Sequence, residues 1–243
     1  MTLPPTTPRA AMILAAGRGT RMGALTEDCP KPMLMVAGKR LIDHAFARAA
    51  EGGAVKVVVN LHYLGGQIRT HLAGLTWPEI LYSDEAQLLE TGGGLVRARP
   101  LLGDAPFYAI NSDAIWTGDA PLPKLAQAWD PARMDVLMLM VPIRDALAYT
   151  RRGDFFLDDD MRPSRRGDAP FAPYVFTGAQ IMAPAALDGF TDRPFSANEI
   201  WDRALAAGRL FGVVHHGGWV DVGTPEGLVT AAAALHRGAE PRP

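Results

Sequence analysis

The chain has 243 residues, of which 48% are hydrophobic and 21% charged, and its formal net charge is −2. These values are typical of a globular protein with an extensive core, and they argue against nucleic acid or an anionic membrane as a partner. The one cysteine, Cys29, excludes an internal disulfide, and no apolar run reaches the roughly 20 residues of a membrane span. We therefore expect a cytoplasmic protein that is a monomer or a small homo-oligomer.

The first predicted element is a buried strand over residues 12–16, because this apolar run shows no polar alternation. Residues 1–9 hold three prolines and one basic residue, so we expect a loose tail ahead of the strand. The apolar run is interrupted at Gly17 and Arg18 and has only Arg9 as a basic residue before it, which does not fit a signal peptide.

A glycine turn follows this strand, and residues 14–22 read L-A-A-G-R-G-T-R-M. Gly17 and Gly19 allow the backbone to turn sharply and to approach a ligand closely. Exposed N–H groups beside arginines suit an anion, and Lys31 adds another cation on a segment stiffened by prolines. The pattern predicts a binding site for a triphosphate.

Three alternatives compete with this interpretation. A Walker-type loop requires Lys-Ser or Lys-Thr after its glycines, which is absent here. A dinucleotide-binding fingerprint requires a third glycine where Met22 stands and an acid near the end of the second strand, where residues 58–61 read V-V-N-L. A plain glycine turn after a buried strand is the third.

The rest of the chain alternates between strand and helix patterns. Helices are predicted over residues 39–51, 64–72, 95–98, 122–129, 198–207 and 225–236. Strands are predicted over residues 55–61, 80–83, 107–111, 134–141, 174–182, 210–214 and 219–222. A polar loop is predicted over residues 84–94 and a hairpin arm over residues 153–157. This alternation indicates an α/β protein with a mostly parallel sheet and helices on both faces.

In such a sheet, ligands bind beyond the carboxyl ends of the strands. We expect one domain over residues 10–236, followed by a short tail over 237–243.

The glycine-turn block and residues 30–33, P-K-P-M, together resemble the signature of the sugar-phosphate nucleotidyltransferases. This resemblance implies a Rossmann-like three-layer α/β/α fold with a mostly parallel central mixed sheet. It also implies dependence on Mg²⁺ and transfer of a nucleotidyl group from an NTP to a sugar 1-phosphate, with release of pyrophosphate. The domain would then have a nucleotide-binding half over residues 10–130 and a sugar-binding half over residues 131–236. The nucleotide-binding residues implied are Leu14, Ala15, Ala16, Gly17, Gly19, Thr20, Arg21, Lys31, Gln87, Gly92 and Asn111.

Two aspartates stand at the ends of predicted strands. Asp113 closes the block N-S-D, and Asp221 lies in W-V-D-V-G-T. Mg²⁺ takes one or two carboxylates and completes its shell with phosphates and water, so we expect both aspartates to bind the metal, although each could instead be a structural residue that caps a turn. The family carries both blocks. Arg21, Lys31 and Asp113 are the predicted catalytic residues, with Arg21 on the β- and γ-phosphates and Lys31 on the α- or attacking phosphate.

The residues that read the base and the sugar are less strongly marked. In the family, a polar residue at the place of Gln87 reads a pyrimidine, and an amide suits uracil; the alternative is a solvated loop residue. The candidate sugar-binding residues are Glu90, Gly153, Asp154, Thr177 and Asp221. The family often has an E-K-P block whose lysine touches the sugar phosphate, but residues 163–167 here read P-S-R-R-G.

Within the family, the chain looks most like the N-acetylmuramate 1-phosphate uridylyltransferases of peptidoglycan recycling, which implies UTP and N-acetylmuramate 1-phosphate as substrates. Arg151, Arg152, Arg165 and Arg166 could bind the lactyl carboxylate of that sugar, or they could form a solvated face. The alternatives are a mannose-1-phosphate guanylyltransferase, a phosphocholine cytidylyltransferase, a nucleotide-sensing regulatory module and an NAD-dependent oxidoreductase.

Overall fold

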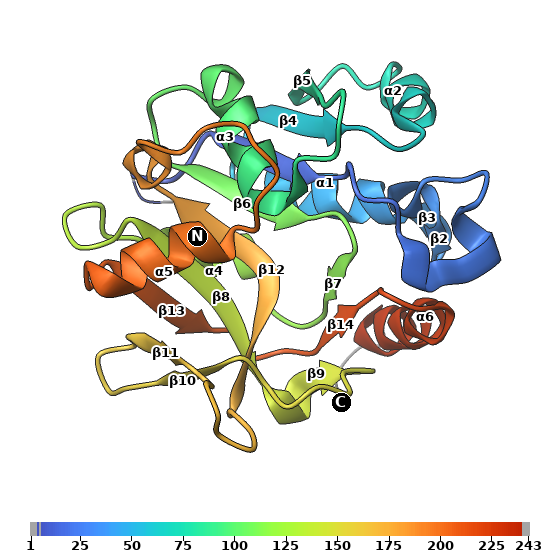
Figure 1. The fold of residues 1–243 in the computed structure, drawn as a ribbon. Helices are drawn as coiled ribbons and strands as arrows, with labels where there is room; N and C mark the ends of the chain where they lie inside the picture. Colours follow the sequence, from blue (N-terminus) through green and yellow to red (C-terminus); the bar gives the residue numbers. More distant parts are fainter. Residues whose placement is uncertain (1–3, 5, 240–243) are drawn as a thin grey trace.

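Strand β1 (Ala10–Leu14) lies near the middle of the main sheet because its residues are almost entirely buried and apolar. It pairs in parallel with β4 (Lys56–Leu61) on one side and with β6 (Phe107–Asn111) on the other. The computed structural model in which these pairs are seen describes residue 4 and residues 6–239, with side chains described as far as residue 237 (Figure 1).

The main sheet has nine strands. Seven follow the order β11-β10-β12-β6-β1-β4-β5, while β8 pairs with β12 and β13 pairs with β8. The remaining strands are β5 (Glu79–Asp84), β8 (Val136–Pro142), β10 (Phe155–Leu157), β11 (Pro163–Arg165), β12 (Tyr174–Met182) and β13 (Leu210–Val214). Within this sheet, β11 and β12 run against the other strands. The prediction of a mostly parallel mixed sheet is confirmed.

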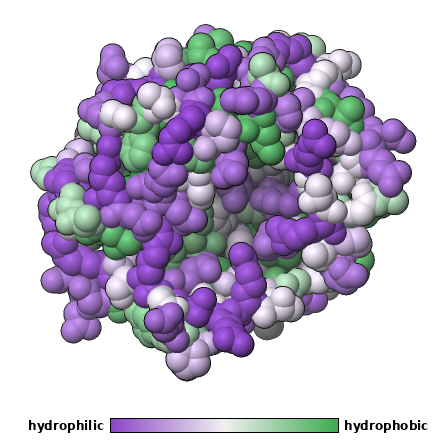
Figure 2. Space-filling model, in the orientation of Figure 1, coloured by the Kyte–Doolittle hydropathy of each residue, from purple (hydrophilic) through white to green (hydrophobic). Residues whose placement is uncertain are grey.

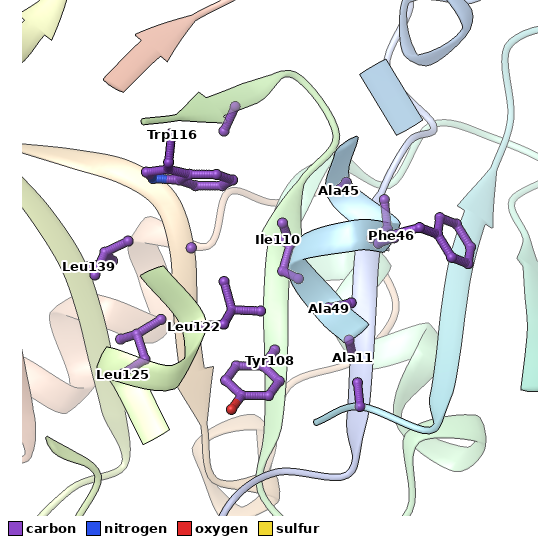
Figure 3. Packing of buried hydrophobic residues seen from close by; sticks show 14 of the residues in the cluster. Ala11, Ala45, Phe46, Ala49, Tyr108, Ile110, Trp116, Leu122, Leu125 and Leu139 are labelled. Carbon is purple, nitrogen blue, oxygen red and sulfur yellow. The ribbon is translucent and has the colours of Figure 1, made fainter. Parts of the chain in front are cut away.

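Helices cover both faces of this sheet and give three layers (Figure 1). Helices α3 (Glu90–Leu102) and α5 (Asn198–Ala206) pack on one face. The opposite face is covered by α1 (Leu41–Glu51), α2 (Gly65–Leu72) and α4 (Pro121–Ala128). Figure 3 shows part of the core on this side, where the side chains from α1 and α4 gather around the sheet. The predicted α/β/α architecture is therefore confirmed.

A smaller sheet of three strands lies beside the main one and was not predicted as a unit. It contains β7 (Ala114–Trp116), β14 (Trp219–Asp221) and β9 (Ala146–Leu147), in the order β7-β14-β9. Helix α6 (Pro225–Ala239) packs against β14 and the short hairpin of β2 (Met35–Val36) and β3 (Lys39–Arg40). Four 3₁₀ turns complete the elements, η1 (Thr20–Thr26), η2 (Lys31–Met33), η3 (Ile143–Asp145) and η4 (Pro184–Leu187).

The largest difference from the predicted elements concerns the glycines of residues 92–94, which we expected in a loop. They lie in the first turns of α3, where the segment around residues 193–195 comes so close to Gly92 and Gly93 that no side chain would fit. A Cβ atom on Gly92 would overlap the ring of Phe195, and one on Gly93 would overlap the carbonyl of Arg193. The low helix propensity of three glycines concealed this helix.

Smaller differences occur at the ends of the chain and of the first strand. β1 begins two residues before the predicted start, and Ala15 and Ala16 are buried in the following loop instead of the strand. Thr7 and Pro8 are also buried, so the described part of the predicted tail over 1–9 is partly packed against the protein. At the other end α6 extends to residue 239, and the rest of the predicted tail lies outside the described residues. Among the helices described, none has the length and apolar character needed to cross a membrane.

The close packing of α3 predicts that Gly93→Ala lowers the free energy of unfolding by about 1–3 kcal/mol, as overpacking does in other cores. The matched control is Gly66→Ala on the exposed side of α2, where a Cβ would meet no atom within 4 Å, so stability should stay the same or rise by about 0.5–1 kcal/mol. Thermal and urea unfolding of both variants measure this. Equal stability of the two variants would contradict the packing account.

Candidate active site

The loop after β1 turns around two glycines that play different parts. The backbone N–H of Ala15 donates to Oδ1 of Asn60 at 2.7 Å, which fixes the start of the loop. Gly19 has a φ of +66°, and a Cβ there would lie 2.8 Å from Cβ of Lys31. Around Gly17, by contrast, no described atom lies within 4 Å of a Cβ position. Gly19 therefore allows Lys31 to pack closely against the loop, and Gly17 leaves the backbone of the loop open to a ligand.

A cavity of about 390 Å³, here called the loop cavity, opens beside this loop at the carboxyl ends of β1 and β6. Figure 2 shows the hollow in the middle of the face, surrounded mainly by hydrophilic residues. The predicted nucleotide-binding residues that line it are Leu14, Ala15, Ala16, Gly17, Gly19, Thr20, Arg21, Lys31 and Asn111. Asp113 and Glu90 line it as well.

Two predicted nucleotide-binding residues lie outside this lining. Gln87 is exposed, although its neighbour Leu88 lines the cavity. Gly92 faces the ring of Phe195, so its lack of a side chain serves the packing of the protein itself. Glu90, which we expected at the sugar, lines the loop cavity and has a φ of +59°, a strained conformation for a residue with a side chain.

An ion pair and a second carboxylate form the centre of the site. Nζ of Lys31, whose residue is only 9% exposed, donates to Oδ2 of Asp113. Asp221 lies close by because the backbone N–H of Val222 donates to the carbonyl of Asp113 at 3.0 Å. Burial raises the pKa of the Asp221 carboxyl, and the negative charge of Asp113 raises it further. The fold thus holds two carboxylates together beside one buried cation.

Two exposed arginines face the same carboxylate. Nη1 of Arg21 and Nη2 of Arg151 each lie 3.8 Å from Oδ2 of Asp221. The guanidinium of Arg21 passes over Gly223, where a Cβ would lie 2.6 Å from Nη1. The glycine of the W-V-D-V-G-T block therefore makes room for the arginine of the glycine turn.

A second cavity of about 520 Å³, here called the arm cavity, adjoins the first. The predicted sugar-binding residues that line it are Gly153, Asp154, Thr177 and Asp221. The residues that line both cavities are Leu14, Arg21, Thr91, Asn111 and Asp113. The two cavities therefore share a wall at Asp113 and Arg21, and Asp221 lies beside this wall in the arm cavity.

Within the arm cavity, the predicted residues differ in what they offer a ligand. The hydroxyl of Thr177 is fully buried and donates to the carbonyl of Leu139 at 2.9 Å, so its proton is already used. Asp154 accepts the hydroxyl of Tyr149 at 3.2 Å and the backbone N–H of Phe176 at 3.2 Å. Burial and the charge of Asp154 raise the pKa of Tyr149 to about 12, which keeps this hydroxyl protonated.

The structure adds a residue to the arm cavity that the sequence reading missed. Gln180 is 3% exposed, and its Oε1 accepts the indole N–H of Trp201 at 2.9 Å. This bond fixes the orientation of the amide and leaves Nε2 as a donor for a ligand in the cavity. Gln180 is, with Thr177, a polar residue inside a mostly apolar strand over residues 174–182, and this was the signal that could have identified it.

Behind the glycine loop lies a buried polar network that was also missed. Glu85 is 5% exposed, and its carboxylate accepts Nδ2 of Asn60 at 2.7 Å and the backbone N–H of Leu89 at 2.9 Å. Since Asn60 also binds the glycine loop, this network connects the loop to the start of α3. Nothing in the sequence distinguishes the buried Glu85 from its exposed neighbour Asp84.

The described residues contain no cluster of three or more His, Cys, Asp or Glu side chains placed to hold a metal ion. Asp113 and Asp221 therefore offer carboxylate oxygens for only part of a coordination shell. Such a donor set suits a hard cation that takes its other ligands from phosphate and water.

Comparison with known proteins gives a consistent result. Residues 10–150 match the family described as Nucleotidyl transferase. The chain is 41% identical over 236 residues to the N-acetylmuramate alpha-1-phosphate uridylyltransferase of Caulobacter vibrioides, covering 94% of this chain and 97% of that protein. It is 36% identical to the enzyme of the same name from Neisseria meningitidis, covering 88% and 93%. It is 29% identical to the mannose-1-phosphate guanylyltransferase of Mycobacterium tuberculosis, covering 96% and 66%.

Solved structures share the fold at lower identity. HddC from Yersinia pseudotuberculosis, in complex with GMP-PN, superposes with a TM-score of 0.76 at 21% identity and covers 93% of this chain and 99% of that one. A UDP-glucose pyrophosphorylase in complex with UDP-glucose gives a TM-score of 0.75 at 18% identity, with coverage of 94% and 98%.

The raised pKa of Asp221 predicts a dependence of stability on pH in the metal-free protein. The pKa of the Asp221 carboxyl is higher in the folded protein than in the unfolded chain, where it lies near 3.8. Binding of the proton by this carboxyl therefore stabilises the folded protein at acid pH. This stabilisation is lost as the pH rises through the raised folded-state pKa. Asp221→Asn should therefore raise the Tm at pH 7.5 in the presence of a chelator, and this gain should shrink as the pH falls.

Thermal unfolding across a pH series measures this effect. The control is Asp159→Asn, at an exposed aspartate, which should leave the Tm unchanged. A lower Tm for Asp221→Asn at pH 7.5 would show that its attraction to the arginines outweighs burial and repulsion.

Proposed function

The chain belongs to the nucleotidyl transferase family, and we propose that it transfers the uridylyl group of UTP to N-acetylmuramate 1-phosphate, releasing pyrophosphate. The observation that carries this proposal is the meeting of two cavities at one cluster of charges, formed by Arg21, Lys31, Asp113 and Asp221. Two anionic substrates must be brought together for this reaction, and each cavity can hold one of them. The names of the relatives from Caulobacter and Neisseria support the choice of substrates.

The loop cavity is the proposed site of the nucleoside triphosphate. Open backbone at Gly17 and the guanidinium of Arg21 suit the phosphates. The exposed Gln87 stands next to the cavity lining at Leu88, and we assign it to the uracil edge, where an amide can both donate and accept.

The arm cavity is the proposed site of the sugar 1-phosphate. Asp154 and the amide of Gln180 offer hydrogen bonds to sugar substituents, with Gln180 suited to a carbonyl oxygen such as that of the acetamido group. The acceptor phosphate would lie at the shared wall, which is formed by the residues that line both cavities, near Arg151 and the two carboxylates.

Mg²⁺ is the proposed cofactor, and the residues present fit it. Asp113 and Asp221 are hard oxygen donors held close together, and the burial of Asp221 favours a partner of opposite charge. When bound there, Mg²⁺ supplies positive charge to phosphate oxygens of both substrates. Asp113 would then exchange its contact with Lys31 for one with the cation, which frees the ammonium group for a phosphate.

The reaction needs no general base from the protein, because the attacking phosphate oxygen is already anionic. That oxygen forms a bond to the α-phosphorus while the bond from this phosphorus to the bridging oxygen of pyrophosphate breaks on the opposite side. Lys31 balances the charge that develops on the α-phosphoryl oxygens, and Arg21 holds the leaving pyrophosphate. Positioning and charge stabilisation supply the catalysis.

A pyrophosphate-release screen tests the proposed function. The four NTPs are each combined with N-acetylmuramate 1-phosphate, N-acetylglucosamine 1-phosphate, mannose 1-phosphate and phosphocholine, in the presence of Mg²⁺. We expect UTP with N-acetylmuramate 1-phosphate to give the highest kcat/KM, and Asp113→Asn to lower that turnover by at least about 10²-fold, as loss of an electrostatic group at a reacting centre does.

The controls for this screen are omission of Mg²⁺ and the surface variant Asp159→Asn. Preference for GTP with mannose 1-phosphate, or for CTP with phosphocholine, would overturn the substrate assignment. Absence of pyrophosphate release with every pair would overturn the proposed activity.

A further inference from the structure

Four arginines line the arm cavity. Arg21 lies beside Asp221 at the wall shared with the loop cavity, and the other three arginines differ in their partners. Nε of Arg165 donates to Asp202 at 2.7 Å, and Nη1 donates to Asn198 at 3.0 Å. Arg151 lies 3.8 Å from Asp221. Each of these two is thus already close to a carboxylate of the protein.

Arg166 differs because its guanidinium binds backbone carbonyls instead of acids. Nη1 donates to the carbonyl of Ala169 at 2.9 Å and to that of Gly167 at 3.2 Å. Its backbone N–H donates to the carbonyl of Asp154 at 2.9 Å, which ties this residue to the wall of the arm cavity. Both the backbone and one end of the side chain are therefore held in place.

The other edge of the Arg166 guanidinium is not used by the part of the chain that the structure describes. Its Nε and Nη2 atoms make no hydrogen bond there, and no described carboxylate lies within 4.0 Å. Nε and Nη2 form the side-on fork that binds a carboxylate through two parallel hydrogen bonds. The half-buried cation in this cavity is thus prepared for an anionic group of a ligand.

Building on the proposed function, the geometry points to Arg166 as the residue that binds the lactyl carboxylate of N-acetylmuramate 1-phosphate. This carboxylate distinguishes that acceptor from N-acetylglucosamine 1-phosphate, while the phosphate and the acetamido group are common to both. Arg166 therefore sets the preference for the carboxylate-bearing acceptor, and the phosphate is left to the charges at the shared wall.

The test compares two acceptors in wild type, Arg166→Gln and Arg152→Gln. Arg152 carries the same side chain in the same sequence region, but it lies outside the lining of the arm cavity. We expect Arg166→Gln to lower kcat/KM for N-acetylmuramate 1-phosphate by about 10- to 100-fold and that for N-acetylglucosamine 1-phosphate by less than about twofold, as fits the loss of a charged hydrogen bond. Arg166→Lys should restore part of the preference because it restores the charge.

The possible results separate this role from the proposed function. A loss of the same size with both acceptors, or no loss with either, overturns the role of Arg166 while the uridylyl transfer itself stands. The same conclusion follows if Arg152→Gln changes the preference as much as Arg166→Gln. Wild type that releases no pyrophosphate from UTP and N-acetylmuramate 1-phosphate overturns the proposed function, and the role of Arg166 with it. The Tm of Arg166→Gln and Arg166→Lys shows whether each variant is folded.

Discussion

The backbone holds two carboxylates that repel one another, Asp113 and Asp221, close together, and the rest of the site is arranged around them. The antiparallel pairing of β14 with β7 sets Asp221 opposite Ala114, next to Asp113, and the hydrogen bond from Val222 to Asp113 closes the ladder. Burial and this repulsion raise the pKa of Asp221. A nearby positive charge relieves this repulsion, and Lys31, which pairs with Asp113, supplies part of that charge.

The place where the two cavities meet is set by the packing of the chain around these carboxylates. Both lie at the edge where the parallel strands end, and the side chains that line both come from several separate segments. Glycines opposite two of them provide the space: a Cβ on Gly178 would lie 2.8 Å from Nδ2 of Asn111, and one on Gly223 would lie 2.6 Å from Nη1 of Arg21. The shared wall is therefore a packing arrangement in which missing side chains admit the charged and polar ones.

How much of this could be predicted depends on whether the determining residues lie close together in the sequence. The glycine turn over residues 14–22 and the aspartate blocks are contiguous, and strands of buried apolar residues have a clear pattern, so these features could be recognised. The start of α3 could not, because Gly93 is required by a segment about one hundred positions away. The arginines of the arm cavity could not be distinguished from the sequence either. The carboxylate partners of Arg165 and Arg151 come from distant elements, helix α5 and strand β14.

In the proposed site, Asp113 and Asp221 together bind the divalent cation that accompanies the nucleotide. The most direct measurement is the anomalous scattering of Mn²⁺ in crystals grown with a non-hydrolysable analogue of UTP. We expect one Mn²⁺ peak within bonding distance of both carboxylates and of a phosphate oxygen, with Lys31 moved from Asp113 to the phosphates. A peak that contacts neither aspartate, with the Lys31–Asp113 pair intact beside the bound analogue, would contradict it.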